Sequence, residues 1–455
     1  MKLGEFNTQT FSPRWSEPYI IVSSFLAVLL PSALLLMLPP FSYSGLSFTD
    51  ALFTATSAIS VTGLGVVDTG SHFTLAGKIL LMLLMQIGGL GQMTLSCVLF
   101  YLFGLRLSLR QQSLAKEALG QEKHINIRQL VIKIVIFSMT AQMIGALLLC
   151  WRWVPQFGWF DGIFTALFHA VSAFNNAGFS LFSNNLVGYH GDTLVSLSLA
   201  ALFIAGGLGF TVVSDIHETW RKNERGWLPK FNKLRLHSKI MLVGTPILLC
   251  SGTVLILLLE HNNPNTLANM PMYDQLLSAF FQSATTRTAG FNTINIGLMT
   301  EPGLLIMMLL MLIGAGPTST GGGLKVSTFA VALLATRAFL RQQNFASAFN
   351  RTLPWPLVTK ALAIMVISAL VLTLAMFLLM LTERAPFYEI MFETISAFAT
   401  VGLTSGLTAN LSEPGKLILI VVMIIGRIGP LTLAYMLSKP KPSCLKYPED
   451  SILTG

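Results

Sequence analysis

The feature that most constrains this chain is a series of apolar blocks, each about as long as a helix that crosses a lipid bilayer. Four of them cover residues 20–38, 75–103, 130–149 and 361–381, and a spanning helix needs ~20 apolar residues. Charged residues make up only 11% of the chain, against roughly a quarter of an average soluble domain. The sequence therefore predicts an integral membrane protein, without a cleavable leader because no small-residue cleavage site follows the first block.

The positive charges predict how the spans are oriented. Of 29 Lys and Arg residues, 21 fall in five segments: the N-terminus, residues 104–128, 216–239 and 337–360, and the C-terminal tail. Because cytoplasmic connections of membrane proteins carry an excess of Lys and Arg, we expect these segments and both termini in the cytoplasm. This topology accounts for the net charge of +9, so we expect membrane lipid, and no nucleic acid, around the protein.

Four short segments share one pattern and divide the chain into four repeats. They read SAISVTGLG, SAFNNAGFS, ATTRTAGFN and SAFATVGLT. Their aligned glycines, Gly63, Gly178, Gly290 and Gly402, are 115, 112 and 112 residues apart, and self-similarity at a fixed period is the signature of internal repeats. We place the repeats at residues 15–104, 128–216, 236–338 and 356–438, with cytoplasmic tails at 1–14 and 439–455.

Each repeat contains a helix that is too short to cross the membrane. An acidic residue, which suits a helix N-terminus, begins a stretch of about three turns before each glycine segment. These residues are Asp50, Asp161, Asp274 and Glu389. Such a stretch enters the membrane and turns back, so each repeat begins and ends on the same side. The predicted fold is an all-α membrane protein with four parallel helix–pore loop–helix repeats around a central pore, giving eight spanning helices and four re-entrant loops.

The glycine segments are predicted to form a cation filter. Non-helical backbone at membrane depth is tolerated only where it is buried in protein or lines a wet cavity, and backbone carbonyls can replace the water around a cation. Helix packing by small residues is the alternative for one glycine, but four glycines in register favour the filter. The predicted ion-binding residues are Val61, Thr62, Gly63, Asn176, Ala177, Gly178, Thr288, Ala289, Gly290, Thr400, Val401 and Gly402.

On these four segments, with one glycine in each, the chain resembles the Trk/Ktr/HKT superfamily of potassium transporters, and within it the membrane subunits of Ktr systems. Some plant members carry Ser in place of the first filter glycine and pass sodium, so Gly63 implies potassium. The resemblance implies a homodimer in the bacterial inner membrane, K⁺ at the filter carbonyls, and a cytosolic nucleotide-binding regulatory ring of the KtrA type. It also implies Na⁺ as an activator and no covalently bound cofactor.

The second apolar block of the third repeat is interrupted by GAGPTSTGGGLK, residues 314–325. One proline and five glycines cannot continue a helix, and the segment lacks the Lys-Ser/Thr ending of a phosphate loop. A kinked helix is one reading; the resemblance implies instead an intramembrane loop that gates the pore, with Arg427 facing the pore beneath the filter. The predicted gate residues are Gly316, Pro317, Thr318, Ser319, Thr320, Gly321, Gly322, Gly323 and Arg427.

Other polar residues in apolar surroundings leave alternatives open. We expect Arg287 to brace its helix against Glu393 or Asp274 rather than to contact ions, and His169 to be a satisfied buried group. The side-chain roles of Gln86, Asn175 and Asn176 are left open, Asn176 being also one of the predicted filter residues, and the cysteines Cys97, Cys150, Cys250 and Cys444 are expected to be inert. No zinc, nucleophile-elbow or Walker motif occurs, so we expect no enzyme. A selective potassium pore is the main interpretation; a sodium/potassium-permeable channel or a coupled cation symporter is the alternative.

The orientation can be tested by labelling. Cysteines introduced near residues 122, 226 and 344 should react with an impermeant reagent only from the cytoplasm, and those near 45, 186 and 265 only from outside. Labelling of residue 226 from outside would contradict the parallel repeats.

Overall fold

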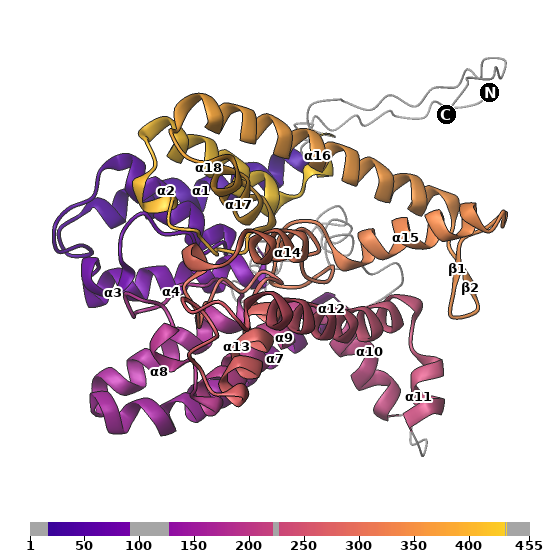
Figure 1. Ribbon diagram of the computed structural model, residues 1–455, viewed down its shortest axis with the longest axis horizontal. Coiled ribbons are helices and arrows are strands. Elements are labelled where there is room, and N and C mark those ends of the chain that lie inside the picture. The colour runs from indigo at the N-terminus through magenta and orange to yellow at the C-terminus, as the bar shows by residue number, and fades with distance from the viewer. Residues whose placement is uncertain (1–16, 92–126, 222–226, 433, 435–455) are drawn as a thin grey trace, which may run out of the picture.

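The computed structural model describes residues 17–91, 127–221, 227–432 and 434, whose regular secondary structure is almost entirely helical (Figure 1). The first group comprises α1 (Glu17–Met37), α2 (Phe48–Ser60), α3 (Thr69–His72) and α4 (Leu75–Leu90). The second comprises α7 (Ile127–Phe157), α8 (Trp159–Phe174), η1 (Val187–Tyr189), α9 (Thr193–Leu208) and α10 (Phe210–Arg221), followed by α11 (Trp227–Lys233). The third comprises α12 (Leu236–Glu260), α13 (Met272–Thr285), η2 (Ile296–Leu298), α14 (Glu301–Leu312) and α15 (Val326–Leu340), followed by β1 (Ser347–Ala348) and β2 (Arg351–Thr352). The fourth comprises α16 (Trp355–Thr382), α17 (Phe387–Ala399), η3 (Thr408–Asn410) and α18 (Glu413–Ile428).

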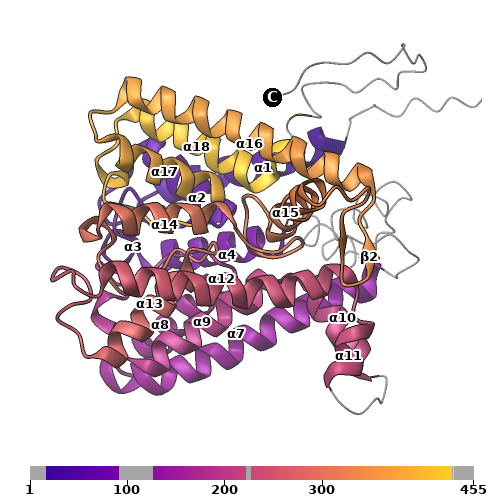
Figure 2. The same ribbon diagram turned by 45° about the vertical axis from the view of Figure 1, so that its right-hand side comes forward.

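Some sequence predictions fall outside this description. Residues 1–16, 92–126, 222–226, 433 and 435–455 lie outside the described residues. They include both predicted tails, most of the basic segment 104–128, part of the basic segment 216–239, Cys97 and Cys444. In the part of the chain that is described, α7, α12 and α16 run roughly along one axis. The helices α10 and α11 and the β hairpin gather at one end of these three helices (Figures 1 and 2). The hairpin is antiparallel and pairs Ala348 with Arg351.

Three of the described helices are long and apolar enough to cross a membrane. They are Val131–Phe157 within α7, Leu236–Glu260 and Trp355–Thr382. Their outward faces expose large apolar side chains, such as Leu147 (65% exposed), Leu258 (63%) and Leu370 (66%). Extended exposed apolar surface of this kind suits lipid and not water. The prediction of a helical membrane protein is therefore confirmed.

The second helix of each group is shorter than the sequence predicted. α4, α9 and α18 have 16 residues each and α14 has 12, fewer than the ~20 of a full span. The first three end at Gly91, Gly209 and Gly429, whose positive φ angles stop the helix. α9 and α10 qualify as a span only together, and they meet at 90°. We expected an interruption in the third repeat alone; the structure shows one in the second and fourth repeats as well, and α4 ends at Gly91, the last described residue of the first repeat.

The four short helices that precede the glycine segments, α2, α8, α13 and α17, are the innermost elements. Each carries its acidic residue in the first turn. In α2, the backbone N–H of Asp50 donates to Ser47 Oγ at 3.1 Å, which satisfies one of the free N–H groups of the helix start. Their last two turns are rich in buried Ala, Ser and Thr. Each packs on the long helix of its own group, α1, α7, α12 or α16.

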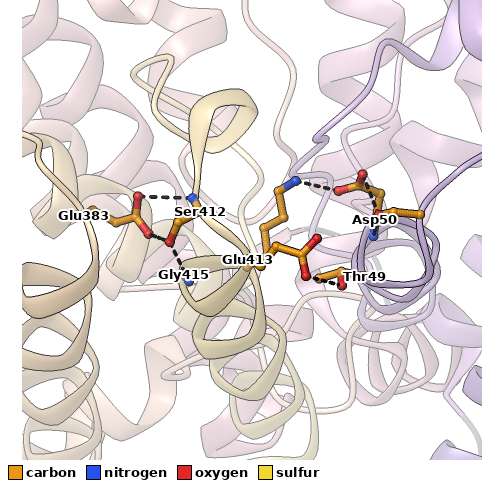
Figure 3. Close-up of polar contacts among 8 residues, drawn as sticks. Thr49, Asp50, Glu383, Ser412, Glu413 and Gly415 are labelled. Atoms are coloured by element: carbon orange, nitrogen blue, oxygen red, sulfur yellow. Dashed lines mark hydrogen bonds and ion pairs between the residues drawn. The ribbon is translucent and has the colours of Figure 1, made fainter.

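Each short helix also packs on the second helix of the preceding group. The pairs are α4 with α8, α9 with α13, α14 with α17 and α18 with α2. The last pair joins the fourth group to the first and closes a circle. There Lys416 Nζ lies 2.6 Å from Asp50 Oδ1 and Thr49 donates to Glu413 at 3.1 Å (Figure 3). Beside them, the carboxylate of Glu383 accepts from the hydroxyl of Ser412, which caps α18.

The Lys416–Asp50 pair should stabilise this closure. The two side chains are only 15% and 22% exposed, so Lys416→Met leaves a partly buried carboxylate without its partner. We expect a loss of roughly 1 kcal/mol, measured as a lower thermal unfolding midpoint in detergent. A double-mutant cycle with Asp50→Asn should show coupling. The control is Arg152→Met, whose pair with Asp192 involves an arginine that is 51% exposed; an equal loss in both variants would contradict the role of Lys416.

Candidate functional site

The structure brings the four glycine segments into one ring. A Cβ atom placed on any of the four glycines would lie less than 3.0 Å from a carbonyl oxygen of the next segment. Gly63 faces the oxygen of Ala177, Gly178 that of Ala289, Gly290 that of Val401, and Gly402 that of Thr62. The order returns to its starting point, so the four backbones surround a common axis. Only glycine permits an approach this close.

The backbone has the same conformation in all four segments. The glycines have φ angles of +69° to +93°, and the residue two positions earlier is also left-handed in each segment: Val61, Asn176, Thr288 and Thr400. A left-handed β-branched residue is strained by roughly 1–2 kcal/mol, and three of these four are β-branched. The surrounding structure must therefore hold this conformation.

The ends of the short helices supply that support. The N–H of Gly63 donates to Ser57 Oγ at 3.0 Å, and the N–H of Gly402 donates to Ser396 Oγ at 3.1 Å. In the second segment Ser172 Oγ instead donates to the carbonyl of Phe179 at 2.8 Å. With N–H groups satisfied by the helix behind them, carbonyl oxygens remain to face the ring. The C-terminal ends of α2, α8, α13 and α17, which carry partial negative charge, lead directly into it.

A cavity of about 510 Å³ opens onto one side of the ring. It is lined by Gly63, Gly178 and Gly402 and by the residues that follow the glycines. Asp68 is the one ionisable side chain in this lining; the others are mainly amides, hydroxyls and backbone. In the described ranges, no three His, Cys, Asp or Glu side chains come together as metal ligands. The arrangement can therefore hold a hard cation through backbone carbonyls and attract it through one carboxylate.

The interrupted segment of the third repeat lies against the opposite side of the ring. The N–H of Gly322 donates to Thr400 Oγ1 at 2.9 Å, and Thr320 Oγ1 donates to Asn176 Oδ1 at 3.3 Å. A Cβ on Gly321 would collide with the side chain of Thr288. The segment thus contacts three of the four glycine segments on this side of the ring.

Two basic side chains hold the loop. Arg427 donates to the carbonyl of Thr320 in the loop and to the carbonyl of Gly88 at the end of α4. Lys325 Nζ donates to the carbonyls of Gly321 at 2.6 Å and Gly322 at 3.1 Å. These contacts of Lys325, unlike the gate position of Arg427, were not predicted from the sequence.

The loop is also bonded to the bend between α9 and α10. The N–H of Gly316 donates to the carbonyl of Gly207 at 2.9 Å, and the N–H of Phe210 donates to the carbonyl of Thr318 at 3.1 Å. These bonds satisfy backbone groups that both interruptions leave free. Backbone groups left unpaired in the irregular segment of one repeat are thus hydrogen-bonded by the irregular segment of another.

The residues left without a role find partners between repeats. Asn176 donates to Thr288 Oγ1 at 2.9 Å, and Gln86 Oε1 accepts from Gln142 at 3.0 Å and from Asn175 at 2.7 Å. These amides join the first, second and third groups. Amide side chains in apolar surroundings indicate that they are paired with other polar groups, but the sequence does not identify these partners, which lie 56 to 112 residues away.

The expectation for Arg287 is wrong. Among the described residues it makes no ion pair with Glu393 or Asp274, although it is 8% exposed, and its Nε has no hydrogen-bond partner. Glu393 is occupied by three hydroxyl groups instead, of Thr404, Ser405 and Thr408. His169 is buried and hydrogen-bonded, as expected.

Fold and site together define a helical membrane protein in which four chain segments surround one axis. Residues 4–447 match the family model TrkH, described as "Cation transport protein". The chain is 67% identical over 439 residues to "Ktr system potassium uptake protein B" of Vibrio alginolyticus, covering 96% of this chain and 95% of that protein. It is 39% identical over 451 residues to "Potassium/sodium uptake protein NtpJ" of Enterococcus hirae, covering 97% and 98%.

The chain belongs to the TrkH family of cation transport proteins, which confirms the resemblance seen in the sequence. These relatives are named as transport proteins, so the prediction that the chain is not an enzyme is also confirmed. The crystal structure of the potassium transporter TrkH from Vibrio parahaemolyticus superposes with a TM-score of 0.75 at 18% identity, over 95% of this chain and 87% of that chain. At this identity the likeness concerns the fold.

Gly290→Ser should damage the ring. The new side chain would meet the carbonyl of Val401 while φ stays at +80°, and strain of roughly 1–2 kcal/mol corresponds to about a tenfold change in an equilibrium constant. We expect a higher KM for potassium or weaker discrimination against sodium, measured as tracer uptake at equal membrane abundance.

The matched control for this variant is Gly406→Ser. Gly406 also has a positive φ, +112°, but no atom lies within 4 Å of its added Cβ. Uptake kinetics that are unchanged in Gly290→Ser, or changed equally in Gly406→Ser, would remove Gly290 from the site.

Proposed function

We propose that this protein takes up potassium across the bacterial inner membrane through a selective pore. The observation that carries the proposal is the ring in which the carbonyls of Thr62, Ala177, Ala289 and Val401 each lie against a neighbouring glycine. Four inward carbonyls at membrane depth are what a cation filter needs. The filter comprises these residues, the four glycines and the left-handed residues before them.

The relatives' names support potassium as the transported ion. Proteins of Vibrio alginolyticus and Bacillus subtilis are named for potassium uptake, and that of Enterococcus hirae for potassium and sodium. We therefore assign potassium as the main substrate and sodium as an activator. A channel permeable to both ions or a coupled symporter is the alternative, which the Enterococcus name favours.

In the proposed architecture, four parallel repeats surround the pore. Each contributes a spanning helix, a re-entrant helix, a filter segment and a second, interrupted span. The cyclic packing of each re-entrant helix on the second helix of the preceding group supports this arrangement. Both termini are assigned to the cytoplasm, together with α10, α11 and the hairpin, because the described basic residues of 216–221, 227–239 and 337–360 lie at that end.

Residues 316–323 are proposed as the gate. The loop presses on three filter segments and is held by Arg427 and Lys325. Four of its eight residues are glycines and none of them lies in a helix, and mobile gates are drawn from regions of low local stability. The cytosolic partner is a nucleotide-binding ring of the KtrA type acting on a homodimer, in line with the word "system" in the relatives' names.

The function and the gate can be tested in one uptake experiment. Potassium-transport-deficient cells expressing the parent, with and without the partner ring, should take up tracer potassium in preference to sodium. Removing part of residues 316–323 should raise the maximal potassium flux with selectivity close to the parent, because the obstruction on the axis is smaller. Arg427→Ala should act in the same direction, since it releases the loop from α4 and removes a positive charge from the path.

The control for the charge is Arg384→Ala on the exposed outer loop, which should leave flux unchanged. A parent that takes up no potassium would refute the function. A shortened loop that reaches the membrane in normal amounts with unchanged or lower flux would refute the gate and leave a structural break.

A further inference from the structure

Two fully buried polar side chains lie behind the ring at the same position in two repeats. Glu393 in α17 is nine residues before Gly402, and His169 in α8 is nine residues before Gly178. Both are 0% exposed. The corresponding residues of the other repeats are Thr54 and Phe281. Neither Glu393 nor His169 touches the axis, so their role must act through other residues.

Glu393 binds the chain that leaves the fourth filter segment. Its Oε1 accepts from the hydroxyl of Thr404, from the N–H of Ser405 at 3.1 Å and from the hydroxyl of Ser405 at 3.4 Å. Its Oε2 accepts from Thr408 Oγ1 at 2.6 Å. A buried carboxylate is tolerated where hydrogen bonds replace its lost hydration. All four bonds come from the segment that follows Gly402.

His169 makes the equivalent contacts in the second repeat. Its Nδ1 lies 2.8 Å from the carbonyl of Thr165, which can only accept, so Nδ1 carries the proton. Its Nε2 then accepts from the hydroxyl of Ser180 at 3.1 Å and from the N–H of Leu181 at 3.4 Å. These are the second and third residues after Gly178, as Thr404 and Ser405 are after Gly402. The carboxylate of Glu393 and the neutral imidazole of His169 thus both accept hydrogen bonds from the second and third residues after a filter glycine.

In the third repeat, the side chain that supports the chain after the glycine comes from the next position along the short helix. In the first repeat, the described residues show no such support. With its oxygen turned toward the chain, the amide of Gln282 accepts from the N–H of Thr293 at 2.9 Å and of Ile294 at 3.2 Å. Thr54 Oγ1 has no hydrogen-bond partner among the described residues. Support behind the ring is therefore unequal, and its strongest form, an ionisable carboxylate, stands in the fourth repeat.

The ring is thereby fixed on both sides of its glycines. In the fourth repeat, Ser396 holds the N–H of Gly402 from the helix end, and Glu393 holds Thr404 and Ser405, which line the outer cavity. A carbonyl ring distinguishes ions only if its oxygens keep their spacing when a smaller ion is present. Groups that hold the coordinating residues from behind set that spacing.

We propose that Glu393 and His169 are positioning residues that set the width of the ring and thereby its preference for potassium over sodium. The inference rests on the proposed function of the ring as a potassium filter. Segments two and four are not neighbours in the ring, so the two side chains hold opposite sides of it.

The test uses Glu393→Gln in the full chain. An amide accepts through one oxygen only, so at least one hydroxyl or N–H loses its acceptor. We expect potassium-to-sodium discrimination in tracer uptake to fall about tenfold, the size expected for one lost hydrogen bond to a charged group. His169→Phe should act in the same direction, and maximal potassium flux per protein in the membrane should change less than discrimination.

Glu260→Gln is the matched control. Glu260 is also 0% exposed and accepts from Thr300, Asn263 and Thr266, but it holds Thr300, the N-cap of α14, and none of these partners belongs to a filter segment. It should lose stability in a similar way while keeping the parent's discrimination. Parental discrimination in Glu393→Gln, or an equal loss in Glu260→Gln, overturns the proposal.

If Glu393→Gln does not reach the membrane, Thr408→Val decides. It removes only the hydroxyl on Oε2 and should lower discrimination by about tenfold, since it too removes one hydrogen bond to the Glu393 carboxylate; no change overturns the proposal. A parent that takes up no potassium would instead refute the proposed function, so the two failures are distinguishable.

Discussion

The close approach of four glycine backbones is the constraint on which the rest of this structure depends. Each glycine lies so near the carbonyl oxygen of the next segment that a single Cβ atom would collide with it. The approach places strained, non-helical backbone in the interior of a membrane protein, where an unsatisfied peptide group costs several kcal/mol. Every surrounding element can be understood as satisfying or holding that backbone.

The second helices show how this is done. In three repeats a glycine of the second helix packs directly on the carbonyl at the end of the short helix; the pairs are Gly88 with Ile59, Gly206 with Phe174 and Gly426 with Phe398. In the third repeat α14 ends at Leu312, and the atoms nearest to a Cβ on the following Gly314 belong to Leu324, Gly322 and Thr288. The chain leaves the helix there and continues as the loop that contacts the ring, so the repeat in which this contact is not seen is the one that supplies the loop.

Sequence alone predicted the features that depend on local pattern, and missed those that depend on distant partners. The four glycines and their acidic helix starts were found because they recur at a regular spacing. The breaks at Gly91, Gly209 and Gly429 were missed because small residues in a membrane helix are ordinarily a sign of packing. Charge suggested an acid for Arg287, yet Glu393 is held by hydroxyls. The contacts between side chains of different repeats depend on how the helices pack in a circle, and the sequence of one repeat alone does not predict them.

The central claim is that the ring of carbonyls binds the transported cation. The most direct measurement is a structure of the purified protein in rubidium, an electron-dense substitute for potassium. The account predicts ion density on the axis, within coordination distance of the carbonyl oxygens of Thr62, Ala177, Ala289 and Val401. Density confined to the outer cavity near Asp68, with an empty ring at saturating rubidium, would contradict it.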